Sequence, residues 1–516
     1  MASRTRTFEY GPLVGVVLAA LAMSVGWGFR GDYGHEAGAM VPGALLGLAI
    51  CLASGRQDWW RRATIMAMCG AIGWAFGGQM SYGRVIGYTA CSSLPNVAYG
   101  YAGLFLIGGL WGGIGAAILA LSVTESRSYL ERFTGPLIVL GLTWIVMDLS
   151  GKTERLAEIF YLHDTDWIAA SSALIVAGVY AAVIRRERQA CYLIMLLAAG
   201  WWAGYTILTL LLGLHMTPPR SDNWSGCVGL FAALLVWLIR RRNRAALTIA
   251  LWGFLVGGIG FAVGDFVQML GRAQWGPIGR WEALQGLDYW KWMEQLFGLI
   301  MGAGVGFVFL KRMRAKLAPP AEDQESRNLN TVGLVFLLMV MMWSNLHKNV
   351  RNWAKGDHIP DSFFGIAAGW WFLLVALLLS AAVMAAIIRH HRRHLRLAPA
   401  SAFGRGQLLF FIILWVAIVG AFTQALPGMS RKGTFFVHTS FWLTGGICSL
   451  IVAMLSDRAR PPDSELAASD PSWKPTARSW ITLLLIPVLI ILLAWLTTST
   501  HDEPLPGSHL RFEQTE

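Results

Sequence analysis

Apolar stretches of helical length recur along the chain from residue 11 to residue 497, and short polar segments separate them. A bilayer core about 30 Å thick requires about 20 predominantly apolar residues in a crossing helix. The pattern therefore predicts an all-α, polytopic transmembrane bundle of about 15 helices, or about 14 if one is re-entrant. The predicted spans lie near 11–29, 37–54, 63–81, 101–122, 135–149, 167–184, 190–213, 225–239, 245–268, 294–310, 331–346, 364–388, 407–426, 434–455 and 479–497.

The polar segments between these spans form two sets that alternate along the chain. One set is compact and basic, with its clearest members at 55–62, 185–188, 240–244, 311–316 and 389–396, and together with the other segments of the same parity it carries 28 of the 42 Lys and Arg residues. Cationic segments stay in the cytoplasm during membrane insertion. We therefore expect a cytoplasmic N-terminus, an outer C-terminal tail, and residence in a plasma or inner membrane.

Composition agrees with this interpretation and removes one alternative. Of 516 residues, 55% are hydrophobic and 14% are charged, whereas soluble domains carry roughly 25% charged residues. The mean hydropathy is +0.51. A net charge of +12 can indicate nucleic-acid binding, but basic residues gathered in alternate loops explain it equally well. We expect the lipid bilayer as a partner, and no nucleic acid.

Two parts of the chain resemble each other. Residues 73–77, followed by Gly83-Arg84, resemble residues 260–264, followed by Gly271-Arg272. We predict a parallel repeat of about six helices, an arrangement found in transporters. The predicted units are a first repeat at 1–189, a second at 190–400 with a linker at 311–330, three further helices at 401–497 with a linker at 456–478, and a polar tail at 498–516.

Glycines recur at four-residue spacing inside several spans. Gly108 and Gly112 form one such pair, and Gly253 and Gly257 form another. Small residues at this spacing allow two helix backbones to approach closely. The pattern predicts tight helix packing, and it leaves open whether the packed surfaces also move.

The first candidate site is the charged segment between the first two spans, with Arg30, Asp32, His35 and Glu36. A cation at the end of one helix and anions at the start of the next suit the helix dipoles, so capping alone is one interpretation. Ionisable groups near hydrocarbon are costly unless partnered. A polar cluster at the mouth of a cavity is the other interpretation.

The second candidate is Asp265, an acid well inside an apolar span. An acid at that depth is a functional candidate, although an ion pair with Arg84 or Arg272 is an equal alternative. Trp275 follows in a polar segment rich in tryptophan. Tryptophan is typical of the membrane interface, and it can also stack against a flat ligand.

Common catalytic and cofactor motifs do not occur in the sequence. Gly151-Lys152-Thr153 ends like a phosphate-binding loop, but Val146 stands where the loop requires glycine. We find no HExxH, no GxSxG and no dinucleotide fingerprint in context. We therefore expect no cofactor, no metal site and no catalytic residue.

The sequence favours a secondary transporter or permease for a small polar or anionic solute, with a site near the outer face. In this hypothesis Arg30 holds an anionic group, Asp32, His35 and Glu36 bind or relay protons, and Asp265 couples the solute to a proton or cation. One alternative is a membrane-embedded transferase acting on a lipid-linked substrate at the outer face, with His35 or His358 assisting an acid. A scaffold subunit without catalysis is the other.

Overall fold

The computed structural model is 80% helical, which agrees with the predicted all-α architecture. Among the described residues the only sheet is a hairpin of two short strands, β1 (Ser362–Phe363) and β2 (Ile366–Ala367). The structure describes residues 12–78, 80–160, 166–217, 222–320, 327–356, 358–393, 401–457 and 477–512.

Many of the helices are suited to a bilayer. Eleven are long and apolar enough to cross a membrane, and four apolar helices of 10–17 residues accompany them. Large apolar side chains on the periphery are open to the surroundings, with Ile175 67%, Leu443 64% and Leu484 71% exposed. Water would penalise that surface, whereas lipid does not. The chain is thus an integral, multi-pass membrane protein, and the count of 15 spans stays a prediction.

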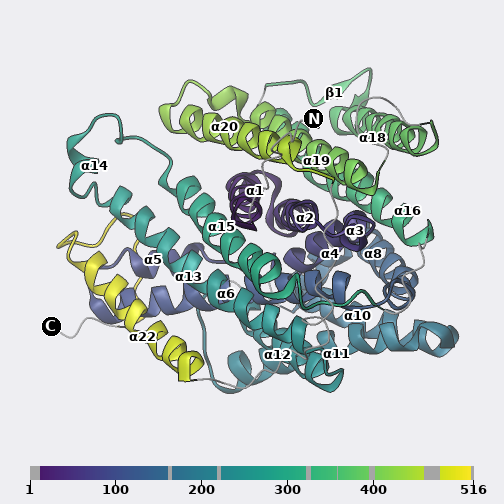
Figure 1. Ribbon diagram of the computed structural model, residues 1–516. Helices are drawn as coiled ribbons and strands as arrows, with labels where there is room; N and C mark the ends of the chain where they lie inside the picture. The colour runs from purple at the N-terminus through teal and green to yellow at the C-terminus, as the bar shows by residue number, and fades with distance from the viewer. Residues whose placement is uncertain are drawn as a thin grey trace, which may run out of the picture.

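A tight helical hairpin occupies the middle of the bundle (Figure 1). Helix α1 (Pro12–Tyr33) and helix α2 (His35–Ala53) are separated by Gly34 alone. Gly34 has a φ of +88°, a backbone conformation that glycine adopts without strain. Helix α15 (Tyr289–Phe307) packs along α1, and its Gly298 and Gly302 face the α1 backbone.

A second pair of helices, α6 (Leu94–Thr124) and α13 (Arg244–Arg272), makes the most extensive helix contact among the described residues. The glycine pairs identified in the sequence form this contact, because Gly108 lies on Gly257 and Gly112 lies on Gly253. A Cβ at Gly112 would lie 3.0 Å from the Gly253 carbonyl carbon and 3.2 Å from the Gly257 Cα. Helix-to-helix backbone contact therefore requires glycine here.

The helical segment between α2 and α6 is interrupted, so that it forms two helices, α4 (Ala63–Ala75) and α5 (Gly83–Thr89). Helix α4 packs on α2 and α6, and the short helix α5 packs on α6. The connection at 76–82 contains the pair Gly77-Gly78, which is unfavourable inside a helix. The break leaves backbone carbonyls available inside the bundle, and the Gly78 carbonyl is used by the site described below.

The remaining helices surround this core. Helices α10 (Asp166–Val183), α11 (Arg188–Gly204) and α12 (Asn223–Arg240) pack successively on one side, and α19 (Ala402–Ala425) and α20 (Lys432–Met454) cover α1 on the other (Figure 1). The other helical elements are α3 (Gln57–Trp60), α7 (Arg127–Glu131), α8 (Thr134–Leu149), α9 (Lys152–Ile159), η1 (Arg185–Glu187), η2 (Tyr205–Leu211), α14 (Pro277–Arg280), η3 (Val308–Met313), α16 (Arg327–Val335), η4 (Phe336–Met341), α17 (Met342–Lys355), α18 (Ala368–Arg393), η5 (Leu426–Gly428) and α22 (Ala477–Thr498).

Arginines, most of them buried, join the connections at one end of the bundle, here called the arginine end. Their guanidinium groups donate to carbonyls near helix ends, where carbonyls lack intrahelical partners. The donations run from Arg56 to the Arg314 carbonyl (2.6 Å), from Arg62 to Ser122 (2.7 Å), from Arg127 to Arg61 (2.9 Å) and from Arg314 to Ser54 (2.8 Å). Several segments that the charge pattern assigns to one side of the membrane thus meet at one end.

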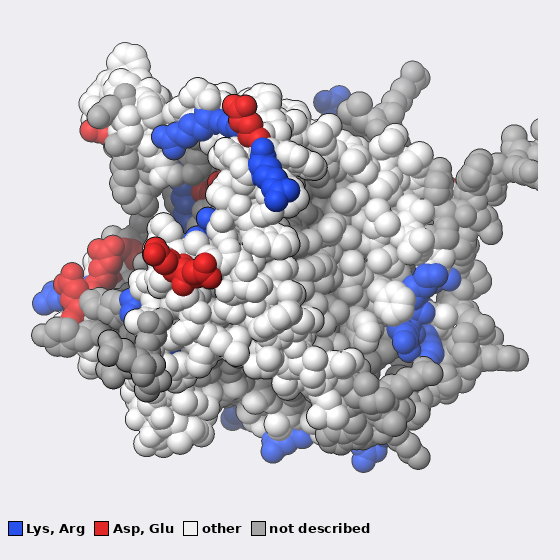
Figure 2. All heavy atoms as spheres, turned by 90° about the vertical axis from the view of Figure 1, so that its left-hand side faces the viewer, with Lys and Arg blue, Asp and Glu red and all other residues white. Residues whose placement is uncertain are grey.

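The opposite end carries α5, α14 and the end of α22 (Figure 1). Figure 2 shows that the charged side chains on this face form a few separate groups and that uncharged surface covers most of it. We call this end the strap end, after the C-terminal segment described below.

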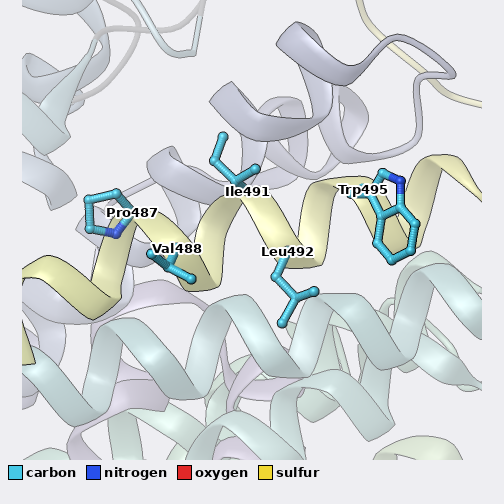
Figure 3. A pocket seen from close by; sticks show the side chains of 5 residues that line it. All are labelled: Pro487, Val488, Ile491, Leu492 and Trp495. Carbon is cyan, nitrogen blue, oxygen red and sulfur yellow. The ribbon is translucent and has the colours of Figure 1, made fainter.

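Helix α22 lies at the edge of the bundle against α6 and α13. Its inner face buries Leu493, Ala494 and Thr497. Its outer face forms a shallow, wholly apolar hollow along one side of the helix, lined by Pro487, Val488, Ile491, Leu492 and Trp495 (Figure 3). An open apolar surface of this kind is suited to lipid chains.

The contact between α6 and α13 gives a direct test of the fold. We expect Gly112→Leu to lower the free energy of unfolding by about 1–3 kcal/mol or more, because the new side chain overlaps the α13 backbone. Thermal denaturation in detergent measures the effect. The matched control is Gly446→Leu on α20, where no atom lies within 4 Å of an added Cβ. Equal denaturation midpoints for both variants would contradict this packing.

Candidate functional site

Arg30 is a deeply buried cation. It lies in the last turn of α1 and is 2% exposed. Its guanidinium carbon stands 5.2 Å from the Trp27 ring centre and 4.9 Å from that of Trp111, so two aromatic faces stabilise the cation. Burial without such partners is strongly unfavourable for a cation.

The broken helix supplies polar partners for Arg30. One guanidinium nitrogen, Nη2, donates to the Gly78 carbonyl at 2.9 Å, and Nη1 donates to the Tyr82 hydroxyl at 3.2 Å. Both acceptors belong to the connection between α4 and α5. A continuous helix would use the Gly78 carbonyl in its own hydrogen-bond ladder. The helix break therefore frees a carbonyl that the buried Arg30 cation needs as a hydrogen-bond acceptor.

Tyr82 extends the hydrogen-bond network from Arg30 to α15. Its hydroxyl donates to the Glu294 carboxylate at 2.7 Å, and its ring stacks on Trp290 with the centres 5.6 Å apart. Glu294 is 2% exposed. The Tyr82 hydroxyl thus connects Arg30 of α1 to the buried carboxylate of Glu294 in α15.

Lys291 completes the network, one turn before Glu294. Its ammonium donates to the Asp32 carboxylate at 2.8 Å and to the Gly28 carbonyl at 3.0 Å, and it stands 3.7 Å from a Glu294 oxygen. We call Arg30, Asp32, Tyr82, Lys291 and Glu294 the central charge cluster. Its two cations and two carboxylates balance formally, which makes the burial of Arg30 and Glu294 and the partial burial of Asp32 and Lys291 tolerable.

The central charge cluster also holds polar atoms without partners among the described residues. Arg30 Nε, Asp32 Oδ2 and Glu294 Oε2 are buried and make no hydrogen bond. Buried polar atoms are normally satisfied by protein or water. The cluster can therefore accept a polar group that donates to its carboxylates or accepts from Arg30.

Asp265 belongs to a separate site on α13. It is fully buried, and neither carboxylate oxygen has a hydrogen-bond partner within the described part of the chain. The Thr89 hydroxyl and the Arg272 guanidinium are the polar groups that act on it most directly. Nearby, the Tyr101 hydroxyl shares a 2.6 Å hydrogen bond with Thr497 of α22.

An aromatic side chain lies between the two sites. Phe261 precedes Asp265 by one turn of α13, and its ring contacts those of Tyr82 and Trp111 at centre distances of 5.1 and 5.8 Å. Phe261 thus contacts Tyr82 of the central charge cluster and lies one helical turn from Asp265.

The C-terminal segment borders the second site. Arg272 donates to the Pro506 carbonyl, and Arg84 lies close enough to His509 to affect it electrostatically. Partial burial, and then the nearby Arg84 cation, lower the pKa of His509 below its ordinary value. His509 is therefore held in its neutral form over a wider range of pH than a free histidine.

The sequence-predicted residues divide between these places. Arg30 and Asp32 belong to the central charge cluster, whereas Asp265 and Arg272 lie together at the second site. Arg84 borders the C-terminal segment, and Trp275 is 49% exposed. The side chains of His35 and Glu36 lie outside the described part of the structure.

Sequence reasoning did not include Tyr82, Lys291 or Glu294 among the site residues. Lys291 and Glu294 resembled ordinary loop charges because they stand at the start of an apolar span. Their spacing of three residues was the available signal, since it puts both on one face of a helix. Nothing in the local sequence of Tyr82 marks it as a bridge.

The charge balance of the cluster predicts a non-additive effect. Lys291→Met leaves the carboxylates of Asp32 and Glu294 without their shared cation, so we expect a loss of roughly 3–5 kcal/mol in stability. The double variant Lys291→Met/Asp32→Asn restores neutrality and should lose less than the single variant. Chemical denaturation in detergent measures both. Arg280→Met at an exposed position is the control, and a single variant as stable as the double one would contradict the pairing.

No known protein family and no curated protein matches the sequence.

Proposed function

We propose that the chain is a secondary transporter for a small polar or anionic solute. The observation that carries this proposal is the central charge cluster, in which two buried and two partly buried ionisable groups meet at a broken helix. Charges inside a membrane protein are costly and are kept where they serve transport or catalysis. Discontinuous helices form the binding sites of many transporters, because their free backbone groups face the solute.

The unpartnered atoms of the cluster indicate the chemistry of the solute. Arg30 Nε offers a donor to an anionic or carbonyl group, and Asp32 Oδ2 and Glu294 Oε2 offer acceptors to hydroxyl or ammonium groups. Trp27, Trp111 and Tyr82 surround Arg30 and favour a compact solute with a planar anionic group.

Asp265 is the proposed coupling residue. A carboxylate without partners in an apolar bundle is strongly disfavoured, so it takes up a proton or a monovalent cation. Arg272 and Thr89 face it and limit how it can be neutralised. Because Phe261 contacts Tyr82 and lies one turn from Asp265, a change of charge at Asp265 can shift the aromatic contact beside the cluster.

The distribution of Lys and Arg among the connecting segments supports one orientation of the chain in the membrane. The arginine end faces the cytoplasm, and the strap end faces the outside of a plasma or inner membrane. The solute then enters from the strap end, on the side of Asp32 and Lys291.

Reconstituted vesicles test the transport proposal. We expect proton uptake, followed with a dye inside the vesicles, when one of a panel of phosphate, sulfate, carboxylates, amino acids or sugars is added outside. Asp265→Asn should reduce this uptake at least about tenfold, because an amide cannot exchange a proton at that site. The exposed Asp502→Asn is the matched control. Unchanged uptake by Asp265→Asn would reject its coupling role, and turnover of a lipid-linked substrate without a gradient would favour the transferase.

Labelling tests the orientation separately. All six native cysteines are buried and free, so background reaction is low. In right-side-out vesicles an impermeant maleimide should react with Glu503→Cys before permeabilisation and with Arg240→Cys only afterwards. Both replaced side chains are exposed, so access depends on the side of the membrane. Reaction of both cysteines from the same side would contradict the orientation.

A further inference from the structure

The chain does not leave the bundle after its last helix. Residues 499–512, here called the C-terminal strap, turn back at the end of α22 and run beside α5 (Figure 1). A polar tail normally stays in solvent unless hydrogen bonds hold it. The strap is held, and one of the groups that hold it, Arg272, also acts on Asp265.

Backbone hydrogen bonds attach the middle of the strap to α5. The Leu505 amide donates to the Ala90 carbonyl at 2.9 Å, and the His509 amide donates to the Gly87 carbonyl at 2.8 Å. The Cys91 thiol donates to the His509 carbonyl at 2.8 Å. These acceptors and donors lie at the end of α5, directly beside Thr89.

Asn96 of α6 clamps the far end of the strap. Its side-chain oxygen accepts from the amides of Arg511 at 2.6 Å and Phe512 at 2.9 Å, and its side-chain nitrogen donates to the Phe512 carbonyl at 3.1 Å. Phe512 also packs edge-on against Tyr99, with ring centres 5.6 Å apart. One buried asparagine thus makes three hydrogen bonds to the last described residues.

The attachment points of the strap adjoin the groups that face Asp265. Ala90 follows Thr89 in the chain, and Arg272 joins the Pro506 carbonyl on one side while acting on Asp265 on the other. Below the strap, Cys91 packs with Tyr101 against α13 and α22. The strap therefore covers the strap-end side of the space around Asp265.

The strap is also suited to open. Much of it is exposed, including Asp502, Glu503 and Leu510, and it is attached mainly through hydrogen bonds, with Leu505 and Phe512 adding apolar contacts. Gly507, with a φ of +77°, offers a flexible point in its middle. Segments with few buried apolar contacts open locally at low free-energy cost.

We propose that the C-terminal strap is a gate that controls access to Asp265 from the strap end. When the strap is docked, Asp265 is closed to solutes on that side. When the strap releases, first from the Asn96 clamp and then from its hydrogen bonds to α5, the end of α5 is uncovered and small ions reach Asp265. What the gate admits rests on the proposed transport function, but the gating itself does not.

Thiol accessibility at position 265 tests the gate without any transport assay. The probe is a small cationic methanethiosulfonate added to protein in vesicles, with modification of each cysteine followed by mass spectrometry. In Asp265→Cys with an intact strap we expect slow reaction. Addition of Asn96→Ala should raise the rate about tenfold or more, because three hydrogen bonds of the clamp are lost.

Two control variants separate gating from general loosening. Asn96→Asp keeps both acceptor contacts and loses the donor, so its rate should lie between those of Asn96 and Asn96→Ala. The exposed strap variant Asp502→Asn should leave the rate unchanged. Equal rates with and without Asn96→Ala would overturn the proposal, and so would equal acceleration by Asp502→Asn.

A second position covers the case in which Asp265→Cys fails to fold. Thr89→Cys reports on the same space from α5 and should show the same order of rates, whereas no acceleration there would also overturn the gate. Failure of the gate and failure of transport remain distinct. Uptake that depends on Asp265 with no effect of the strap on labelling rejects only the gate, and strap-dependent labelling without uptake rejects only transport.

Discussion

A charge inside an apolar bundle must find its partners within the same chain, and the centre of this structure is arranged around that requirement. Arg30 cannot reach bulk water, so it uses a carbonyl, a hydroxyl and the faces of aromatic rings. Lys291 uses two carboxylates and a carbonyl in the same way. Opposite charges then meet in equal number, because an excess of either sign would be expelled or neutralised.

The broken helix follows from the same requirement. A continuous helix between residues 63 and 89 would satisfy its own carbonyls and offer none to Arg30. Because glycine is unfavourable inside a helix, the glycine pair after α4 lowers the free-energy cost of the interruption. The freed carbonyl of Gly78 then stabilises the Arg30 cation. Tight glycine contacts between α6 and α13, and between α1 and α15, hold the surrounding helices close enough for these short-range bonds to form.

The two ends of the bundle use polar groups differently. At the arginine end, guanidinium groups donate to carbonyls near helix ends and join successive connections. Toward the strap end, Asp265 and parts of the central charge cluster retain buried polar atoms that make no hydrogen bond among the described residues, and backbone hydrogen bonds hold the C-terminal strap on α5.

Membrane class and the chemical types at the sites were readable from the sequence, because hydropathy, loop charge and a buried acid such as Asp265 are local properties. Glycine spacing also predicted tight helix packing, although it did not show that the glycines of α6 face those of α13. The pairing of Arg30 with Tyr82, and of Asp32 with Lys291, was not readable, since the partners lie 52 and 259 positions apart. The packing of distant helices alone decides such contacts. It also decided that the predicted residues divide into two places and that a polar tail docks on α5, because backbone hydrogen bonds such as those of the strap depend on geometry and leave no mark in composition.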